Sequence, residues 1–212
     1  MTERININYR VGIGDYGMTH GSATGMIHKS DVIMDSYNAL ERWVVALQRA
    51  HHQVSASAKF WSEEDDNSRE KAMEKVLDYL RNNSFVIGAY IFFAEIPEKA
   101  SEYSFDPALL GFIDNEIDSL CDRNHDFYVH FVQRADFNIL ENLRLSTREL
   151  EVALYRSSVL SRLEEDTANA AIINRLSNYV YHYSCFRAAK LYPNEPITEW
   201  TSNPRPKFEP YD

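Results

Sequence analysis

Apolar residues recur at helical spacing along the chain, starting just after Asp31. Steps of four and three residues place the apolar side chains of a first helix on one face, namely Ile33, Tyr37, Leu40, Val44 and Leu47. Asp31 is a residue type that caps the start of a helix. The wholly polar stretch 62–68 breaks the pattern. The sequence therefore predicts a first long helix that begins at Asp31.

Four further helices are predicted downstream. The second carries Met73, Val76, Leu77 and Leu80 and continues through the apolar run 85–94, whose ten residues favour helix over strand. The third follows the N-cap and first-turn pair Asp106-Pro107 and carries Leu109, Leu110, Ile113, Ile117 and Leu120. The fourth is expected over 136–163, with Leu140, Leu143, Leu150 and Leu154. The fifth carries Ile172, Leu176, Tyr179 or Val180, Tyr183 and Phe186.

Glycine and proline gather at the two ends of the chain. Five of the seven glycines precede residue 30, and five of the seven prolines lie at or after Pro193. The long span between them is poor in residues that break helices. We therefore predict an all-α protein with one domain: a glycine-rich N-terminal loop over 1–30, a five-helix bundle over 31–191, and an extended tail over 192–212.

Composition excludes several classes of protein. Of the 212 residues, 44% are hydrophobic and 25% charged, as in ordinary globular domains. A net charge of −10 argues against nucleic-acid binding through phosphate neutralisation. Two cysteines form neither a disulfide framework nor a four-cysteine zinc site, and we expect no metal site built from the protein's own ligands. The first residues lack an apolar signal core and no run reaches the ~18 residues of a membrane span, so we expect a cytoplasmic protein.

The segment 11–25 contains all five N-terminal glycines and is followed by Lys29. Glycine-rich loops bind phosphate because their exposed backbone N–H groups converge where no side chain blocks the approach. The spacing matches neither G-x-x-x-x-G-K-[ST] nor the dinucleotide fingerprint. On spacing alone, a plain flexible loop stays an alternative to a phosphate-binding one.

The order of residues in this segment resembles one known family. Gly14, Asp15, Gly17 and Thr19, then Lys29 and Asp31, then Tyr37, look like the ATP-binding N-terminus of the PduO-type ATP:corrinoid adenosyltransferases. In that family the loop reads T-[KR]-T-G-D-x-G-x-T and is followed by K-x-D-x-R-V-x-A-Y-G. Further blocks occur in family order: 82–89 is similar to N-D-L-F-x-L-G-A, 131–136 stands where F-V-L-P-G-G is expected, and 173–184 resembles L-N-R-L-S-D-Y-L-F. The resemblance covers about residues 9–187.

The resemblance implies a five-helix bundle that forms a homotrimer. It implies that ATP with Mg²⁺ is bound at the subunit interface, and that cobalamin or another corrinoid lies beside it. The 5′-deoxyadenosyl group would move from ATP to cob(I)alamin and triphosphate would be released. Phe131 matches an aromatic residue that displaces the lower axial ligand of cobalt, and Glu41 falls at the acidic partner of a family arginine. The implied nucleotide-binding residues are Gly14, Asp15, Gly17, Thr19, Lys29, Asn174 and Arg175.

One family motif has lost its arginines. The family has A-R-T-x-x-R-R-A-E-R ahead of the last helix, and these arginines hold the triphosphate and a structural ion pair. Gapless counting from Phe131 puts Thr147 at the first arginine, Glu151 and Val152 at the central pair, Leu154 at the glutamate and Tyr155 at the last arginine. Glu41 is then expected to face Thr147. Three nearby arginines are candidates to replace the missing ones, namely Arg144, Arg148 and Arg156, and Mg²⁺ held by Glu151 is another way to compensate.

These observations leave more than one function open. The first hypothesis is an adenosyltransferase that acts on a corrinoid at a trimer interface. The second is a binding protein on the same scaffold, which holds a corrinoid or nucleotide without transferring the adenosyl group. A third, an assembly module without a ligand, is supported only by the apolar bundle.

Overall fold

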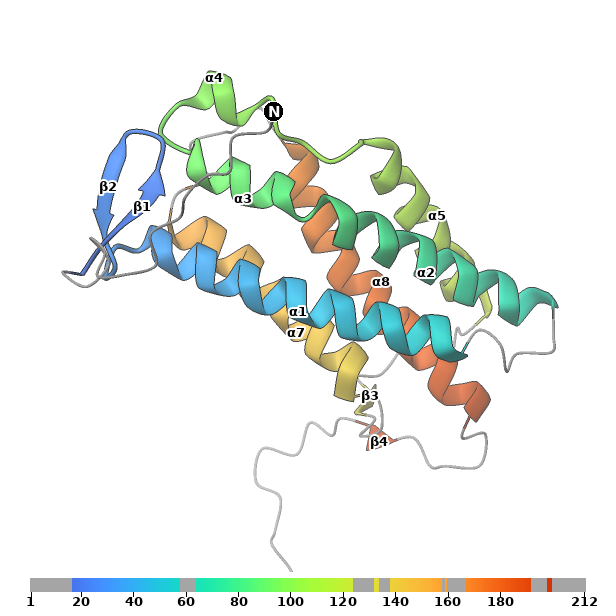
Figure 1. The fold of residues 1–212 in the computed structure, drawn as a ribbon. Coiled ribbons are helices and arrows are strands. Elements are labelled where there is room, and N and C mark those ends of the chain that lie inside the picture. Colours follow the sequence, from blue (N-terminus) through green and yellow to red (C-terminus); the bar gives the residue numbers. More distant parts are fainter. Residues whose placement is uncertain are drawn as a thin grey trace, which may run out of the picture.

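Helices dominate the computed structural model, which describes residues 17–57, 64–123, 132–133, 138–157, 159, 167–191 and 198–199. Within these residues the helices are α1 (Ile33–Ser57), α2 (Glu64–Asn83), α3 (Phe85–Phe92), α4 (Pro97–Ala100), α5 (Ala108–Arg123), α7 (Asn138–Arg156) and α8 (Thr167–Leu191). Four short strands accompany them: β1 (Met18–Ser22), β2 (Gly25–His28), β3 (Val132–Gln133) and β4 (Thr198–Glu199). The predicted helical class is confirmed (Figure 1).

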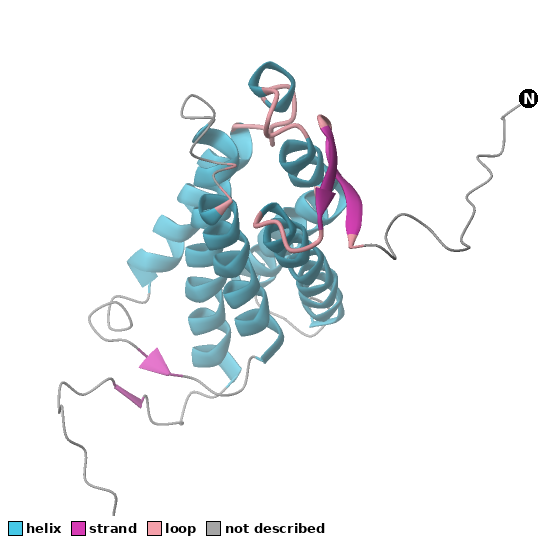
Figure 2. Ribbon diagram, turned by 90° about the vertical axis from the view of Figure 1, so that its left-hand side faces the viewer, coloured by secondary structure: helices cyan, strands magenta, loops and turns pink. Residues whose placement is uncertain are grey.

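The long helices form a bundle in which each packs on its neighbours (Figures 1 and 2). Helix α1 lies between α2 and α7, and α8 lies between α7 and α5. Helices α1 and α7 are antiparallel, since Ser36 at the start of α1 meets Ser157 just after the end of α7. Helices α2 and α3 run end to end and together make one rod of the bundle.

The expected continuous helix through 85–94 is interrupted at Ser84. Two side chains there compete with the helical backbone: Asn83 Nδ2 donates to the Tyr79 carbonyl at 2.8 Å, and Ser84 Oγ donates to the Arg81 carbonyl at 3.2 Å. Helix α3 restarts at Phe85 without a side-chain cap. The apolar run is nonetheless helical, as predicted, with Val86, Ile87, Tyr90 and Ile91 buried.

The core face of α1 is rotated from the predicted one. Ile33 and Leu47 are buried as expected, but Tyr37, Leu40 and Val44 are only partly buried. Trp43 fills the centre instead and is fully buried. The small residues Ala39, Ala46 and Ala50, also buried, leave room for close packing along the same stripe.

Polar groups inside the bundle are matched across helices. Trp43 Nε1 donates to Thr147 Oγ1 at 3.1 Å, and Ser36 Oγ lies 2.8 Å from Ser157 Oγ. On α8, the buried Asn169 side chain accepts from the Phe105 N–H and donates to the Tyr103 carbonyl, both at 2.9 Å. A buried polar group left unpaired costs about 1–3 kcal/mol, so these pairs fix the register of each helix relative to its neighbour.

A charged cluster closes the end of the bundle where α8 terminates. Glu70 and Arg187 are both buried, with Arg187 Nε 3.6 Å from Glu70 Oε1. Arg69, also buried, donates to Ser119 Oγ at 2.9 Å and lies over the Phe186 ring. Burial raises the pKa of the neighbouring Tyr183 hydroxyl well above its usual value. The phenol therefore stays protonated at neutral pH.

Three expectations about segment ends are revised. Helix α7 ends at Arg156 and not at 163, and the next residue, Ser157, turns its hydroxyl to Ser36 and to the Leu154 carbonyl. Part of the expected N-terminal loop is a β-hairpin, with β1 and β2 antiparallel. In the C-terminal tail, β4 pairs antiparallel with β3. No helix in the part of the chain that the structure describes is long and apolar enough to cross a membrane.

Candidate functional site

The β1–β2 hairpin brings three of the expected nucleotide-binding residues together. Thr19 pairs with Ile27 in the ladder, and the Lys29 N–H donates to the Gly17 carbonyl at 2.7 Å. Gly17 has φ of 76°, a conformation that favours glycine, and an added Cβ would come within 3.0 Å of the His28 ring. Gly14 and Asp15 lie outside the described residues. The open end of the hairpin thus carries Gly17 in a left-handed backbone conformation, the Thr19 hydroxyl and Lys29.

Helix α1 supports this hairpin. Asp31 caps the helix as predicted, since its carboxylate accepts from the Ile33 N–H at 3.0 Å. Tyr37, one turn further on, donates its hydroxyl to the Gly21 carbonyl at 2.9 Å. Burial raises the pKa of Tyr37 to about 12, so the phenol remains a neutral donor at any physiological pH. The tyrosine of the N-terminal motif is therefore a support for the hairpin.

Asn174 and Arg175 are adjacent in α8 but contact different helices. Asn174 Nδ2 donates to Glu151 Oε1 on α7 at 3.0 Å. Arg175 Nε lies 2.8 Å from Asp114 Oδ1 on α5. Arg175 and Asp114 are both partly exposed, so their ion pair contributes at most about 1 kcal/mol to stability. Arg175 can therefore leave Asp114 and pair with another anion. In this structure the two residues hold α8 to both neighbours and do not converge on one point.

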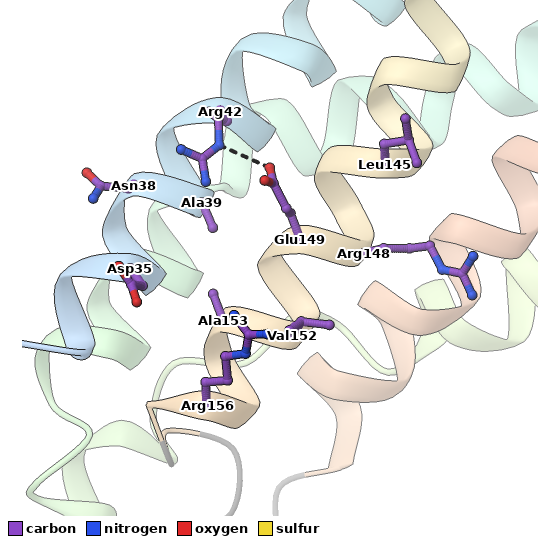
Figure 3. A pocket seen from close by; sticks show the side chains of 10 residues that line it. All are labelled: Asp35, Asn38, Ala39, Arg42, Leu145, Arg148, Glu149, Val152, Ala153 and Arg156. Atoms are coloured by element: carbon purple, nitrogen blue, oxygen red, sulfur yellow. Dashed lines mark hydrogen bonds and ion pairs between the residues drawn. The ribbon is translucent and has the colours of Figure 1, made fainter.

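A groove of about 550 Å³ runs between the start of α1 and the end of α7 (Figure 3). Asp35, Asn38 and Arg42 line it from α1. Leu145, Arg148, Glu149, Val152, Ala153 and Arg156 line it from α7. Arg42 Nε and Glu149 Oε2 form an ion pair across it at 3.0 Å. The start of α1, which contributes Asp35 and Asn38 to the groove, directly follows the β1–β2 hairpin (Figure 1).

The three candidate replacement arginines separate in the structure. Arg148 and Arg156 both line the groove, with Arg156 near Val152 and Ala153 and Arg148 extended along the other side of α7 (Figure 3). Arg144 is paired with Glu141, a hydrogen bond that raises the pKa of the guanidinium. At 1.5 Å per residue, Arg144 stands about 18 Å down the helix from Arg156. The structure does not bring Arg144 to the groove.

Glu41 does not face Thr147, contrary to expectation. Thr147 is fully buried and meets Trp43, whereas Glu41 is exposed. Glu41 lines a second groove of about 650 Å³ with Arg42, Val45 and Arg49, on the far side of the Arg42–Glu149 pair. The reason is the rotation of α1, which turns Trp43 inward and Glu41 outward.

Phe131 lies outside the described residues, so its expected role at the corrinoid is not tested. The next two residues form β3, which pairs with β4 of the tail. Among the described residues, no group of three His, Cys, Asp or Glu side chains is close enough to hold a metal ion.

A sequence model of the cobalamin adenosyltransferase family matches residues 10–187, most of the chain. The chain belongs to the cobalamin adenosyltransferase family. Solved structures of a PduO-type ATP:corrinoid adenosyltransferase from Lactobacillus reuteri share its fold. An arginine-to-lysine variant complexed with ATP superposes with a TM-score of 0.57 at 18% identity, covering 89% of this chain and 98% of that chain.

Two further structures of the same Lactobacillus reuteri protein, each with one phenylalanine replaced and each complexed with cobalamin and ATP, give similar TM-scores. The change to alanine gives 0.56 at 18% identity, covering 89% and 96% of the two chains. The change to histidine gives 0.58 at 17% identity, covering 90% and 95%. At this identity the likeness shows the fold. A comparison with curated protein sequences finds no match.

Burial indicates how the family's arginine motif fits α7. The gapless register puts an arginine position at Thr147 and the glutamate position at Leu154, both 0% exposed. Charged side chains are almost never fully buried unless they are paired. A shift by one residue puts the first and last arginines of the motif at Arg148 and Arg156, which are exposed and line the groove. The central pair then falls at the exposed Val152 and at Ala153, which is 8% exposed, and the glutamate falls at the exposed Tyr155. The shifted register, with one extra residue between Phe131 and Thr147, therefore leaves one charged position of the motif buried in place of two.

Several site residues were missed by reasoning from the sequence. Asp35, Asn38 and Arg42 line the groove from α1, and their spacing of three and four residues on its polar side was the available signal. Counting from Lys29 in the family motif also puts Ile33 at an arginine position, and Ile33 is buried. The loss of basic residues is thus not confined to α7.

The shifted register predicts that an arginine at position 147 is harmful. Thr147→Arg would force a charge into a fully buried place and remove the acceptor of Trp43 Nε1–H, and should lower the free energy of unfolding by about 3 kcal/mol or more. Glu151→Arg, at a partly exposed place, should change it by less than about 1 kcal/mol. Urea denaturation measures both. A Thr147→Arg protein as stable as the wild type would contradict the shifted register.

Proposed function

We propose that the protein is an ATP:corrinoid adenosyltransferase that acts as a cytoplasmic homotrimer, with ATP and Mg²⁺ bound where subunits meet. The family match over residues 10–187 carries this proposal. Two features near the start of α1 support it. The open end of the hairpin, with Gly17, Thr19 and Lys29, leads directly into α1, and α1 and α7 share the groove that Arg148 and Arg156 line.

The cations would act on the leaving group. Transfer forms a bond between cobalt and C5′ of ATP with the electron pair of Co(I), and breaks the bond from C5′ to the triphosphate oxygen. Negative charge then grows on the departing triphosphate, and fixed cations stabilise it. Each charge-assisted hydrogen bond contributes about 1.5–3 kcal/mol. Lys29, Arg148 and Arg156 are the cations suited to this task, and Mg²⁺ would supply further charge.

The remaining expected roles complete the proposal. Gly14 and Asp15 would extend the phosphate-binding backbone beyond Gly17. The corrinoid would lie beside the nucleotide, and the Phe131 ring would exclude the lower axial ligand of cobalt. Glu41 would serve as the acidic partner of an arginine in the second groove, which Arg42 and Arg49 also line. No nucleic acid or membrane is a partner in this proposal.

The outer face of α1 and α7 is the surface that we assign to trimer contacts. It exposes apolar side chains that a single chain leaves in water, namely Val45, Leu145, Val152 and Tyr155, each between 46% and 54% exposed. The two grooves lie on the same face and share Arg42, Leu145 and Glu149. A second subunit seated here would bury this apolar area and close the grooves.

A second function is favoured by specific observations. Ile33 is buried at an arginine position of the family motif, and Asn174, an expected nucleotide-binding residue, already donates to Glu151. These features reduce the number of donors available to a triphosphate. They favour a protein that binds a corrinoid or nucleotide without transferring the adenosyl group.

Anaerobic turnover separates the two functions. Purified protein is mixed with Mg-ATP and chemically reduced cob(I)alamin, and adenosylcobalamin is followed by its absorption spectrum. We expect turnover, with kcat/KM for ATP lowered about tenfold to a hundredfold in Arg156→Gln and in Lys29→Ala, because each removes a charge-assisted contact. Arg144→Gln is the matched control and should leave kcat/KM within about twofold. Absence of turnover with calorimetric binding retained would favour the binding protein.

The trimer contact can be tested separately. Val152→Asp places a charge in the middle of the α1–α7 face and should shift the sedimentation coefficient from trimer toward monomer. Phe85→Asp is the control, since Phe85 is 63% exposed on α3, away from that face. Dissociation by Phe85→Asp but not by Val152→Asp would place the contact elsewhere.

A further inference from the structure

We propose that Glu95 is a positioning residue for the nucleotide: its carboxylate holds the tip of the β1–β2 hairpin on the end of α3 and so sets where the open end of the hairpin stands. The inference rests on the proposed function, because the open end carries Gly17, Thr19 and Lys29. Glu95 itself lies in the turn after α3, far along the sequence from the hairpin.

The tip of the hairpin is fastened to this turn by three bonds. Ser22 Oγ donates to Glu95 Oε2 at 2.8 Å, and Thr24 Oγ1 donates to the same carboxylate oxygen. Between them, the Ala23 N–H donates to the Phe92 carbonyl at 2.9 Å. One carboxylate oxygen therefore collects both hydroxyls of the tip. Hydrogen bonds to a charged acceptor are about twice as strong as neutral ones.

The Ser22 and Thr24 hydroxyls have the Glu95 carboxylate as their charged acceptor. Ser22 is buried, and its Oγ also lies 2.8 Å from Thr24 Oγ1 and accepts from the Thr24 N–H at 3.2 Å. Without Glu95 the two hydroxyls would share one network with no charged acceptor. Of the tip's described bonds to α3 and the turn after it, the backbone bond to Phe92 would then remain.

The hairpin needs such a fastening because two strands alone are marginally stable in water. Its ladder is short and irregular between Thr19 and Ser22. Along its length the bundle also supports it through Tyr37, which bonds the Gly21 carbonyl, through Met34, which lies next to Gly21, and through Ile27, which packs against the core. Glu95 and Tyr37 fix the half of the hairpin that includes its tip. Because the two strands are paired, this fixes the orientation of the hairpin and so the position of its open end.

The hydrogen bonds described for the Glu95 carboxylate go to Ser22 and Thr24, neither of which is expected at the phosphates. Its effect should therefore fall on ATP binding and not on the chemical step. We expect Glu95→Ala to raise the KM for ATP about tenfold, with kcat within threefold and the KM for the corrinoid unchanged. Glu95→Gln retains a carbonyl oxygen that can accept both hydroxyls, and should recover most of the loss.

Glu98→Ala is the matched control. It removes a carboxylate three residues further on, and that carboxylate makes no hydrogen bond to any residue that the structure describes. Ser22→Ala combined with Glu95→Ala should be less harmful than the product of the single effects, because both remove the same contact. A rise in KM shared by Glu98→Ala, or one that Glu95→Gln does not recover, would overturn the inference.

Hydrogen exchange separates this inference from the proposed function. In the wild type, the Ala23 and Lys29 amides should be protected by their bonds to Phe92 and Gly17. Glu95→Ala should remove protection over residues 18–29 while α1 and α8 keep theirs. This readout needs no turnover, so an inactive wild type would sink the proposed function and leave Glu95 to be judged on exchange. Unchanged protection in Glu95→Ala would overturn the assignment of Glu95.

Discussion

The antiparallel contact of α1 with α7 is the constraint on which the rest of the structure depends. The contact is built on the buried Trp43 and a stripe of alanines, and two polar pairs fix its register: Trp43 with Thr147, and Ser36 with Ser157. A slip by one residue would leave both pairs unmatched in a buried place. The cost of unmatched buried groups therefore fixes the register.

That register has consequences at the surface. Once Thr147 is directed inward, Arg148, Val152 and Arg156 must lie outward, since residues at intervals of four share a face of a helix. Arg156 then stands opposite Asp35 in the groove, beside the part of α1 that follows the hairpin. The same contact leads the chain from Lys29 and Asp31 into Ile33 and so sets the base of the hairpin. Packing inside the bundle thereby determines which charges can reach a bound nucleotide.

Much of this fold could be predicted from the sequence, because helical periodicity and the scarcity of glycine and proline act locally. The Asp31 cap and the apolar helix after Ser84 are examples. The face of α1 could not be predicted, because Trp43 lies inside only when Thr147, far away in the sequence, meets its N–H group. The hairpin was missed because glycine-rich segments do not alternate clearly. Counting from Phe131 puts an arginine of the family motif at the buried Thr147, and a one-residue insertion that would move it to an exposed place leaves no trace in one sequence. The groove itself arises from side chains of two helices, so the spacing of Asp35, Asn38 and Arg42 could indicate its α1 side but not its α7 side.

In the proposed function, Arg148 and Arg156, placed by the α1–α7 contact, hold the triphosphate. Isothermal titration calorimetry with AMP, ADP and ATP, each with Mg²⁺, on the wild type and on the double variant Arg148→Gln/Arg156→Gln tests this role. Affinity should rise with each added phosphate in the wild type by about fivefold or more, and this increase should be largely lost in the double variant while AMP binds equally to both. Equal increases in the two proteins would show that the triphosphate is bound elsewhere.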